Sequence, residues 1–161
     1  MPLFDDGWGD MHLIVHRQEE QRPGMNPYIL IIDADAQAAK ITGAVISQIA
    51  STVDLKIASN IQDGWSLMQQ RWPDLLLIDP SQHQSHALKL IQRIKTVNPA
   101  TRVVVIASIP TPALRRRMSD LAVELYFEKP LLLPLCEGEL RALMHTGEPD
   151  APSAMAVSIA R

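Results

Sequence analysis

Short, continuous runs of apolar residues alternate along this chain with longer stretches in which apolar residues recur every three or four positions. The runs Tyr28–Ile32 and Leu75–Ile78 have no charged residue at any position. Runs of this length and composition are typical of strands buried on both faces of a parallel sheet. Shorter or less uniform runs predict three more strands, at residues 55–58, 103–106 and 125–127.

The stretches between these runs have helical periodicity. The first helix is expected to begin after Asp35, whose carboxylate can accept hydrogen bonds from the amides of the first turn, and to reach about residue 50. Its buried face is expected to carry Ile41, Val45 and Ile49. Four further helices are predicted in the same way. Three have apolar positions at helical spacing, namely Ile61, Trp65, Met68 and Trp72; Ala87, Leu88, Ile91 and Ile94; and Leu114, Met118 and Leu121. The last is expected to cover residues 132–144.

Five strands alternating with five helices predict an α/β domain over residues 28–145. Right-handed crossovers leave few topologies, and the flavodoxin-like, doubly wound parallel sheet with strand order 2-1-3-4-5 is the commonest for five strands. Residues 1–27 contain several glycines and prolines without sustained periodicity, and they predict an irregular amino-terminal arm. Residues 146–161 are rich in small residues and predict a flexible carboxyl-terminal tail.

The composition is that of an ordinary globular protein, with 47% apolar and 20% charged residues among 161. A formal net charge of -3 provides no electrostatic argument for binding to nucleic acid or to a membrane surface. No apolar stretch approaches the roughly 18 residues of a membrane span. Asp5 and Asp6 stand where a secretory signal has basic residues, and the single cysteine, Cys136, suits a reducing compartment. A cytoplasmic location is therefore expected.

Three charged residues stand where apolar strands end. Asp33 follows the first predicted strand, Asp79 follows the third, and Lys129 follows the fifth. In the strand order 2-1-3-4-5 the first and third strands are neighbours, so the two carboxylates should face each other. Ligands of such sheets bind outside the carboxyl ends of the strands. The sequence therefore predicts an acidic pocket with a cation at its edge.

These motifs resemble those of the response-regulator receiver domain, the family of the bacterial chemotaxis regulator. The segment 29–35 reads Ile-Leu-Ile-Ile-Asp-Ala-Asp and resembles the first strand and acidic turn of the family. Segment 73–79 resembles the strand that ends in the phosphoacceptor aspartate, and segment 125–130 resembles the fifth strand with its Lys-Pro. The arginine triplet 115–117 lies in the matching fourth helix. The resemblance covers about residues 28–145.

The resemblance implies a role for each residue of the pocket. Asp79 would accept a phosphoryl group from a sensor histidine kinase, a phosphotransfer protein or a small phosphodonor. Asp33 and Asp79 would hold Mg²⁺ together with the backbone carbonyl of Ser81, which is consistent with the preference of Mg²⁺ for oxygen ligands. Lys129 would pair with the phosphoryl oxygens. Tyr126, three residues before this lysine, falls where the family has its switch aromatic.

The chain departs from the family pattern at three places. Ala34 occupies the position of a second acid, and Asp35 is one residue too late to replace it, so Mg²⁺ binding is expected to be weakened. Ala107 occupies the position of the hydroxyl that contacts the phosphoryl group, with the candidate switch residue Ser108 one position later. The loop 80–86 lacks the Gly-rich turn of the family.

Two functions are consistent with this pattern. The first is a stand-alone receiver in a two-component phosphorelay, because too few residues follow Pro130 for an output domain. Such a receiver is expected to be a signalling module rather than an enzyme. Its output would be contact with a downstream protein through the fourth helix and fifth strand. The second is a pseudo-receiver that acts without phosphorylation as an interaction or dimerisation module, for example as a homodimer. A flavodoxin-like enzyme is disfavoured because residues 33–36 contain no Gly-rich phosphate loop.

Overall fold

The sheet has five parallel strands in the order β2-β1-β3-β4-β5, and five helices alternate with them, which confirms the predicted fold. The computed structural model describes residues 25–145, and within that range no helix is long and apolar enough to cross a membrane. The predicted tail and most of the predicted arm lie outside this range. In chain order the elements are β1 (Tyr28–Ile32), α1 (Ala36–Ile49), β2 (Asp54–Ala58), α2 (Ile61–Gln70), β3 (Leu75–Ile78), α3 (Gln84–Val97), β4 (Arg102–Ala107), α4 (Pro112–Asp120), β5 (Leu125–Glu128) and α5 (Leu133–His145).

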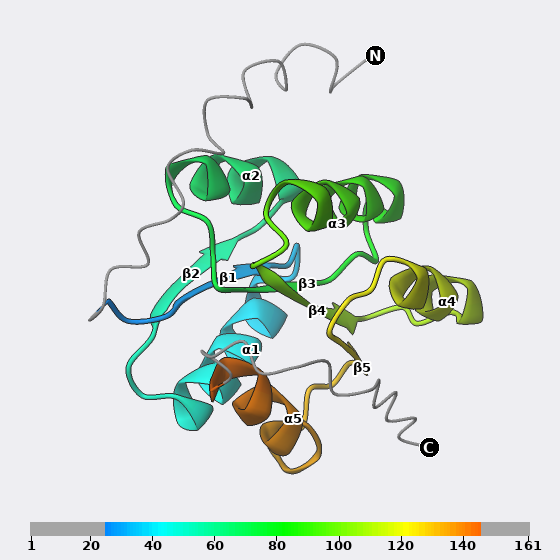
Figure 1. Cartoon of the computed structure of the whole chain (residues 1–161). Helices are drawn as coiled ribbons and strands as arrows, with labels where there is room; N and C mark the ends of the chain where they lie inside the picture. The colour runs from blue at the N-terminus through cyan, green and yellow to red at the C-terminus, as the bar shows by residue number, and fades with distance from the viewer. Residues whose placement is uncertain (1–24, 146–161) are drawn as a thin grey trace.

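The helices form two layers around the sheet. Helices α1 and α5 lie on one face, α2 and α3 lie on the other, and α4 lies beside β4 and β5 (Figure 1). Each layer has its own buried cluster, one centred on Met68, Ile91 and Leu114 and the other on Ile46 and Leu140. The sheet is therefore covered on both sides, as expected for parallel strands.

The residues of β1 divide between the two clusters. Leu30 and Ile32 pack with α2 and α3, whereas Ile29 and Ile31 pack with α1 and α5. Successive side chains of a strand point to opposite faces, so a strand covered on both sides must be apolar at every position. This requirement explains the continuous apolar runs of the sequence.

The register of the sheet fixes where its central strands end. Strands β1 and β3 pair in parallel, with Ile32 opposite Ile78. Asp33 and Asp79 are the next residues of the two strands, and the Asp79 amide donates to the Ile32 carbonyl oxygen at 3.0 Å. The pairing therefore places the two aspartates next to each other at the carboxyl edge.

Side-chain caps define the starts of three helices. Asp35 accepts hydrogen bonds from the amides of Gln37 and Ala38 and caps α1, which confirms that prediction. Asn60 caps α2 in the same way, and Thr111 caps α4 just before Pro112. Each cap satisfies amides that have no partner within the helix.

Two expectations about the helices are wrong. Ile41 is 55% exposed, because the buried face of α1 centres on Ala39, Thr42 and Ile46 and Ile41 lies beyond its edge. Trp72 lies outside α2, whose last residue is Gln70. The residue before a proline is restricted to extended conformations, and Pro73 imposes this restriction on Trp72.

Gly64 of α2 packs directly against the sheet, and this contact generates a prediction. A Cβ atom at Gly64 would lie 2.3 Å from Cδ1 and 2.8 Å from Cγ1 of Ile32, a buried side chain with little room to move. We expect Gly64→Ala to lower the free energy of unfolding by about 1–2 kcal/mol, because overpacking outweighs the gain in helix propensity. Urea denaturation measures the change.

Gly138 of α5 provides the matched control. A Cβ atom there would have no neighbour within 4 Å, so Gly138→Ala should raise the free energy of unfolding by about 0.5–1 kcal/mol. Equal effects of the two substitutions would contradict close packing at Gly64.

Candidate functional site

Asp33, Asp79 and Lys129 lie together at the carboxyl edge of the sheet, and we refer to these three residues as the acidic centre. The ammonium nitrogen Nζ of Lys129 is 2.6 Å from Oδ2 of Asp33 and 2.8 Å from Oδ2 of Asp79. The side chains of Lys129, Asp33 and Asp79 are only 16%, 6% and 8% exposed, respectively. One ammonium therefore bridges two nearly buried carboxylates.

Backbone hydrogen bonds hold each residue of the acidic centre in place. The Asp33 amide donates to the carbonyl oxygen of Ala58 at 3.1 Å, and the Lys129 amide donates to that of Ala107 at 2.9 Å. These bonds continue the ladders of the sheet one residue beyond the ends of the strands. The backbone of each residue of the acidic centre is thus held by hydrogen bonds to the neighbouring strands.

The remaining carboxylate oxygens also have donors. Oδ1 of Asp33 accepts from the amide of Asp35 at 2.9 Å. Oδ1 of Asp79 accepts from the amide of Ser81 at 2.9 Å and has a longer contact of 3.4 Å with the amide of Ser108. All four carboxylate oxygens of the acidic centre are therefore satisfied by the protein itself, as buried ionised groups require.

These contacts shift the pKa values of two of the residues. Burial by itself raises the pKa of the Asp79 carboxyl, but hydrogen bonds from Lys129, Ser81 and Ser108 outweigh it and lower that pKa below its usual value. Burial likewise lowers the pKa of Lys129, whereas its bonds to the two aspartates raise it, with a net increase. Asp79 and Lys129 are therefore ionised at neutral pH.

The acidic centre offers two carboxylates to a metal ion. Within residues 25–145 there is no group of three or more histidine, cysteine or acidic side chains that could hold a metal. Mg²⁺ nevertheless binds through one or two carboxylates when waters and phosphate oxygens complete its coordination, so Asp33 and Asp79 fit this ion. Ala34, at the position of the missing acid, is exposed beside them.

The end of β4 lacks a hydroxyl at its last residue. Ala107 is fully buried there, and Ser108 follows as an exposed residue whose hydroxyl is one of the groups that lower the pKa of Asp79. Ser108 thus contacts the candidate phosphoacceptor although it stands one position later than the family pattern. Its switch role stays a prediction.

Tyr126 of β5 points into the protein. Its hydroxyl oxygen is buried and has no hydrogen-bond partner among the described residues, and the Arg115 guanidinium lies 5.5 Å from the centre of its ring. Burial, followed by the charge of Glu128, raises the pKa of this phenol. Arg115 also forms a salt bridge with Glu128, so these three residues connect α4 to β5.

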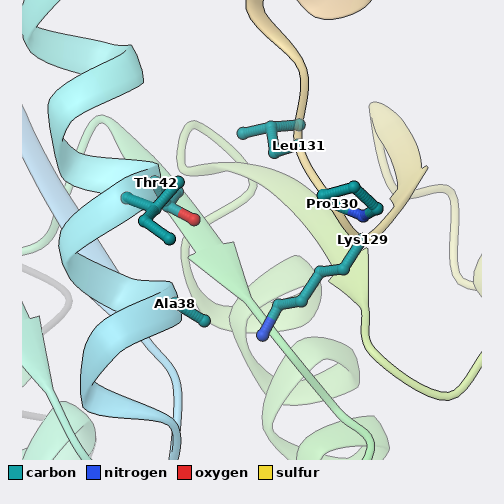
Figure 2. Close-up of a pocket in the computed structure, with 6 residues that line it drawn as sticks. Ala38, Thr42, Lys129, Pro130 and Leu131 are labelled. Carbon is teal, nitrogen blue, oxygen red and sulfur yellow. The ribbon is translucent and has the colours of Figure 1, made fainter.

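Two features of the site were not predicted from the sequence. The hydroxyl oxygen of Ser81 accepts from the amides of Ser108 and Ile109, whereas the sequence motif assigns a role only to the backbone carbonyl of Ser81. A hollow of about 340 Å³ also lies beside Lys129, lined by Ala38, Ile41, Thr42, Lys129, Pro130 and Leu131. Figure 2 shows the Lys129 side chain extending along this hollow toward Ala38 of α1. The sequence carries no signal for this hollow, because the helical spacing places its lining residue Ile41 on the buried face, whereas the structure exposes it.

Comparison with known proteins assigns the family. The model of the response regulator receiver domain matches residues 29–136, which is more than half of the chain. The chain therefore belongs to the response regulator receiver domain family, whose members are signalling modules of two-component systems. This assignment confirms the resemblance seen in the motifs.

Individual relatives support the same assignment. The methanol utilization control regulatory protein MoxX of Paracoccus denitrificans is 29% identical over 91 residues, covering 55% of this chain and 40% of that protein. The chain therefore spans less than half the length of this curated relative. The signal receiver domain of a DNA binding response regulator from Colwellia psychrerythraea 34H is 25% identical with a TM-score of 0.67, over 73% of this chain and 98% of that chain. A signal receiver domain from Clostridium thermocellum shares the fold at 18% identity and a TM-score of 0.67, over 75% of this chain and 99% of that chain.

The ion pairs of Lys129 generate a prediction about stability. Lys129→Met would leave two nearly buried carboxylates without their counterion, so the free energy of unfolding should fall by about 3 kcal/mol at about pH 7. The pKa of Asp79 is lower in the folded state than its usual value. The ionised Asp79 carboxylate therefore stabilises the folded state at pH values above its usual pKa, and this stabilisation is lost as the pH falls through the lowered pKa. The difference between wild type and variant should therefore shrink at about pH 3. Urea denaturation at both pH values measures it.

Lys95→Met is the control. Lys95 pairs with Glu124 away from the acidic centre, and these two side chains are 19% and 26% exposed. The loss there should be about 1 kcal/mol, because a more exposed pair contributes less. A Lys129→Met variant as stable as Lys95→Met would contradict the importance of the acidic centre.

Proposed function

We propose that the chain is a receiver of a two-component phosphorelay in which Asp79 accepts the phosphoryl group. The observation that supports this role is the environment of the Asp79 carboxylate. It is kept ionised at the carboxyl edge of the sheet, between one ammonium and the donors of two loops. An ionised oxygen is the nucleophile required, and positioned positive charge is the main catalytic need of phosphoryl transfer.

The proposed transfer uses the residues of the acidic centre and the backbone carbonyl of Ser81. An oxygen of the Asp79 carboxylate attacks the phosphorus of a phosphohistidine or small acyl phosphate, a bond from phosphorus to the donor breaks, and the donor leaves with that electron pair. The Lys129 ammonium, 2.8 Å from Asp79, is placed to pair with the phosphoryl oxygens. Asp33, Asp79 and the Ser81 carbonyl would hold Mg²⁺, which supplies further charge neutralisation when bound.

Partners follow from this chemistry. The phosphoryl donor would be a sensor histidine kinase or a phosphotransfer protein, in the cytoplasm. The output would be contact with a downstream protein through the surface of α4 and β5, where Arg115 covers the Tyr126 ring. Arg116 and Arg117, the next two residues of α4, are also exposed and add positive charge to this helix.

A second function is supported by the substitutions at the site. Ala34 and Ala107 replace an acid and a hydroxyl, and the protein's own groups already satisfy every carboxylate oxygen of the acidic centre. In this alternative the chain is a pseudo-receiver, an interaction or dimerisation module that needs no phosphorylation. Phosphoryl uptake decides between the two.

The decisive experiment is incubation of the full chain with Mg²⁺ and acetyl phosphate, followed by intact mass spectrometry. We expect one phosphoryl adduct that hydroxylamine removes, as it does an acyl phosphate, and Asp79→Asn should lose the adduct. Asp120→Asn, at the exposed end of α4, is the matched control and should keep it. No adduct on the wild type would favour the pseudo-receiver, and an adduct surviving in Asp79→Asn would assign it elsewhere.

The missing acid generates a separate prediction. Because ligand charge and number set the affinity of a Mg²⁺ site, Ala34→Asp should tighten Mg²⁺ binding on the order of tenfold. The position is exposed, so the added carboxylate meets no steric barrier. Ala36→Asp adds the same charge two residues later, in the first turn of α1, and should change the affinity little. Calorimetric titration measures the Mg²⁺ affinity of the wild type and of both variants. Equal affinities in these three proteins would contradict the explanation that Ala34 weakens Mg²⁺ binding.

A further inference from the structure

Strand β2 forms one edge of the sheet, and alternate backbone groups along it face away from the other strands. Among residues 25–145, β2 pairs with β1 alone. The Asp54 amide, at the start of β2, donates to the Pro27 carbonyl oxygen at 2.8 Å and therefore points toward β1. Backbone groups of successive strand residues alternate in direction, so those of Leu55 and Ile57 point outward. Outward groups of this kind are a template for a further strand.

The same edge is apolar on the face that packs against α1. The side chains of Leu55 and Ile57 lie 3.0 and 3.9 Å from where a Cβ atom of Gly43 in α1 would be. Ile57 is nevertheless 44% exposed, because α1 covers this margin of the sheet only in part. The charged side chain of Lys56 points to the opposite face and does not interrupt the apolar strip.

The described chain enters the sheet beside this edge. The Asn26 carbonyl oxygen accepts from the Arg71 guanidinium at 3.2 Å, and the same guanidinium pairs with the Asp54 carboxylate at 3.1 Å. Together with the bond between Pro27 and Asp54, these contacts hold the residues before β1 at the start of β2, which lies at the margin of the sheet (Figure 1). The segment that precedes them is thus attached next to the open edge.

That segment contains a sequence typical of a strand. Residues 11–15, which lie outside the described range, read Met-His-Leu-Ile-Val and place Met11, Leu13 and Val15 on one face of an extended chain. The segment is as long as β2. Residues 16–24 span about 30 Å when extended, whereas a strand beside β2 lies only about 10 Å from β1. The connection is therefore long enough.

We propose that residues 11–15 bind the β2 edge as an additional strand, antiparallel to β2. The direction follows from the attachment point, because a strand that ends where β2 begins needs only a short connection to reach β1. The face that carries Leu13 covers Leu55 and Ile57, and its backbone pairs with their outward groups. An antiparallel edge strand on an otherwise parallel sheet is a common arrangement, and it closes an edge that otherwise favours association between copies.

The test is amide hydrogen exchange of the full chain, measured by NMR. In the wild type the amides of Leu55 and Ile57 should exchange at least about fivefold more slowly than in an unstructured peptide, as expected for an ordinary hydrogen bond. Leu13→Asp removes an apolar contact and a strand-favouring residue and should abolish this protection. Leu13→Gly should do the same without adding a charge. The Lys56 amide faces β1, so its exchange should stay slow in both variants.

Leu3→Asp is the matched control, because it makes the same change in the same arm outside residues 11–15, and it should leave the protection intact. Unprotected amides of Leu55 and Ile57 in the wild type, or protection that survives both Leu13 variants, would overturn the proposal. Repeating the measurement at several protein concentrations identifies the other occupant of the edge. Protection that disappears on dilution would overturn the proposal and assign the edge to a second copy of the chain. Phosphoryl uptake enters none of these measurements.

Discussion

The bridge from one ammonium to two buried carboxylates is the interaction on which the site depends. Ions taken out of water are costly unless they are paired and hydrogen-bonded, so Lys129 must reach Asp33 and Asp79 together. The three residues follow three different strands, and the bridge forms only when these strands have the correct register. The strand register that defines the fold is therefore also required to form the site.

A second layer of hydrogen bonds connects this bridge to the surface of the protein. Ser81 joins Asp79 to the loop before α4, and Arg115 of α4 reaches Tyr126 and Glu128 of β5. Hydrogen bonds and ion pairs between neighbouring residues thus extend from the acidic centre to the loop before α4 and from α4 to β5.

Two alanines distinguish the site of this receiver domain from the family pattern. Ala34 removes a carboxylate from the rim, and Ala107 removes a hydroxyl from the end of β4. With Lys129 in place, the acidic centre keeps a single formal negative charge, because two carboxylates face one ammonium. The proposed Mg²⁺ site would therefore attract the ion less strongly than a site with a further carboxylate.

The strands, the strand order and the meeting of Asp33, Asp79 and Lys129 could be predicted from the sequence, because continuous apolar runs and strand ends obey local and topological rules. The contacts of Ser81 and the exposure of Ile41 could not be predicted in this way, because they depend on how distant segments pack in three dimensions. The Ser81 hydroxyl meets amides 27 and 28 residues away, through loops whose path no periodicity encodes. Ile41 lies at the edge of a helical stripe, and which edge is covered depends on how α1 packs against its neighbours rather than on the stripe itself.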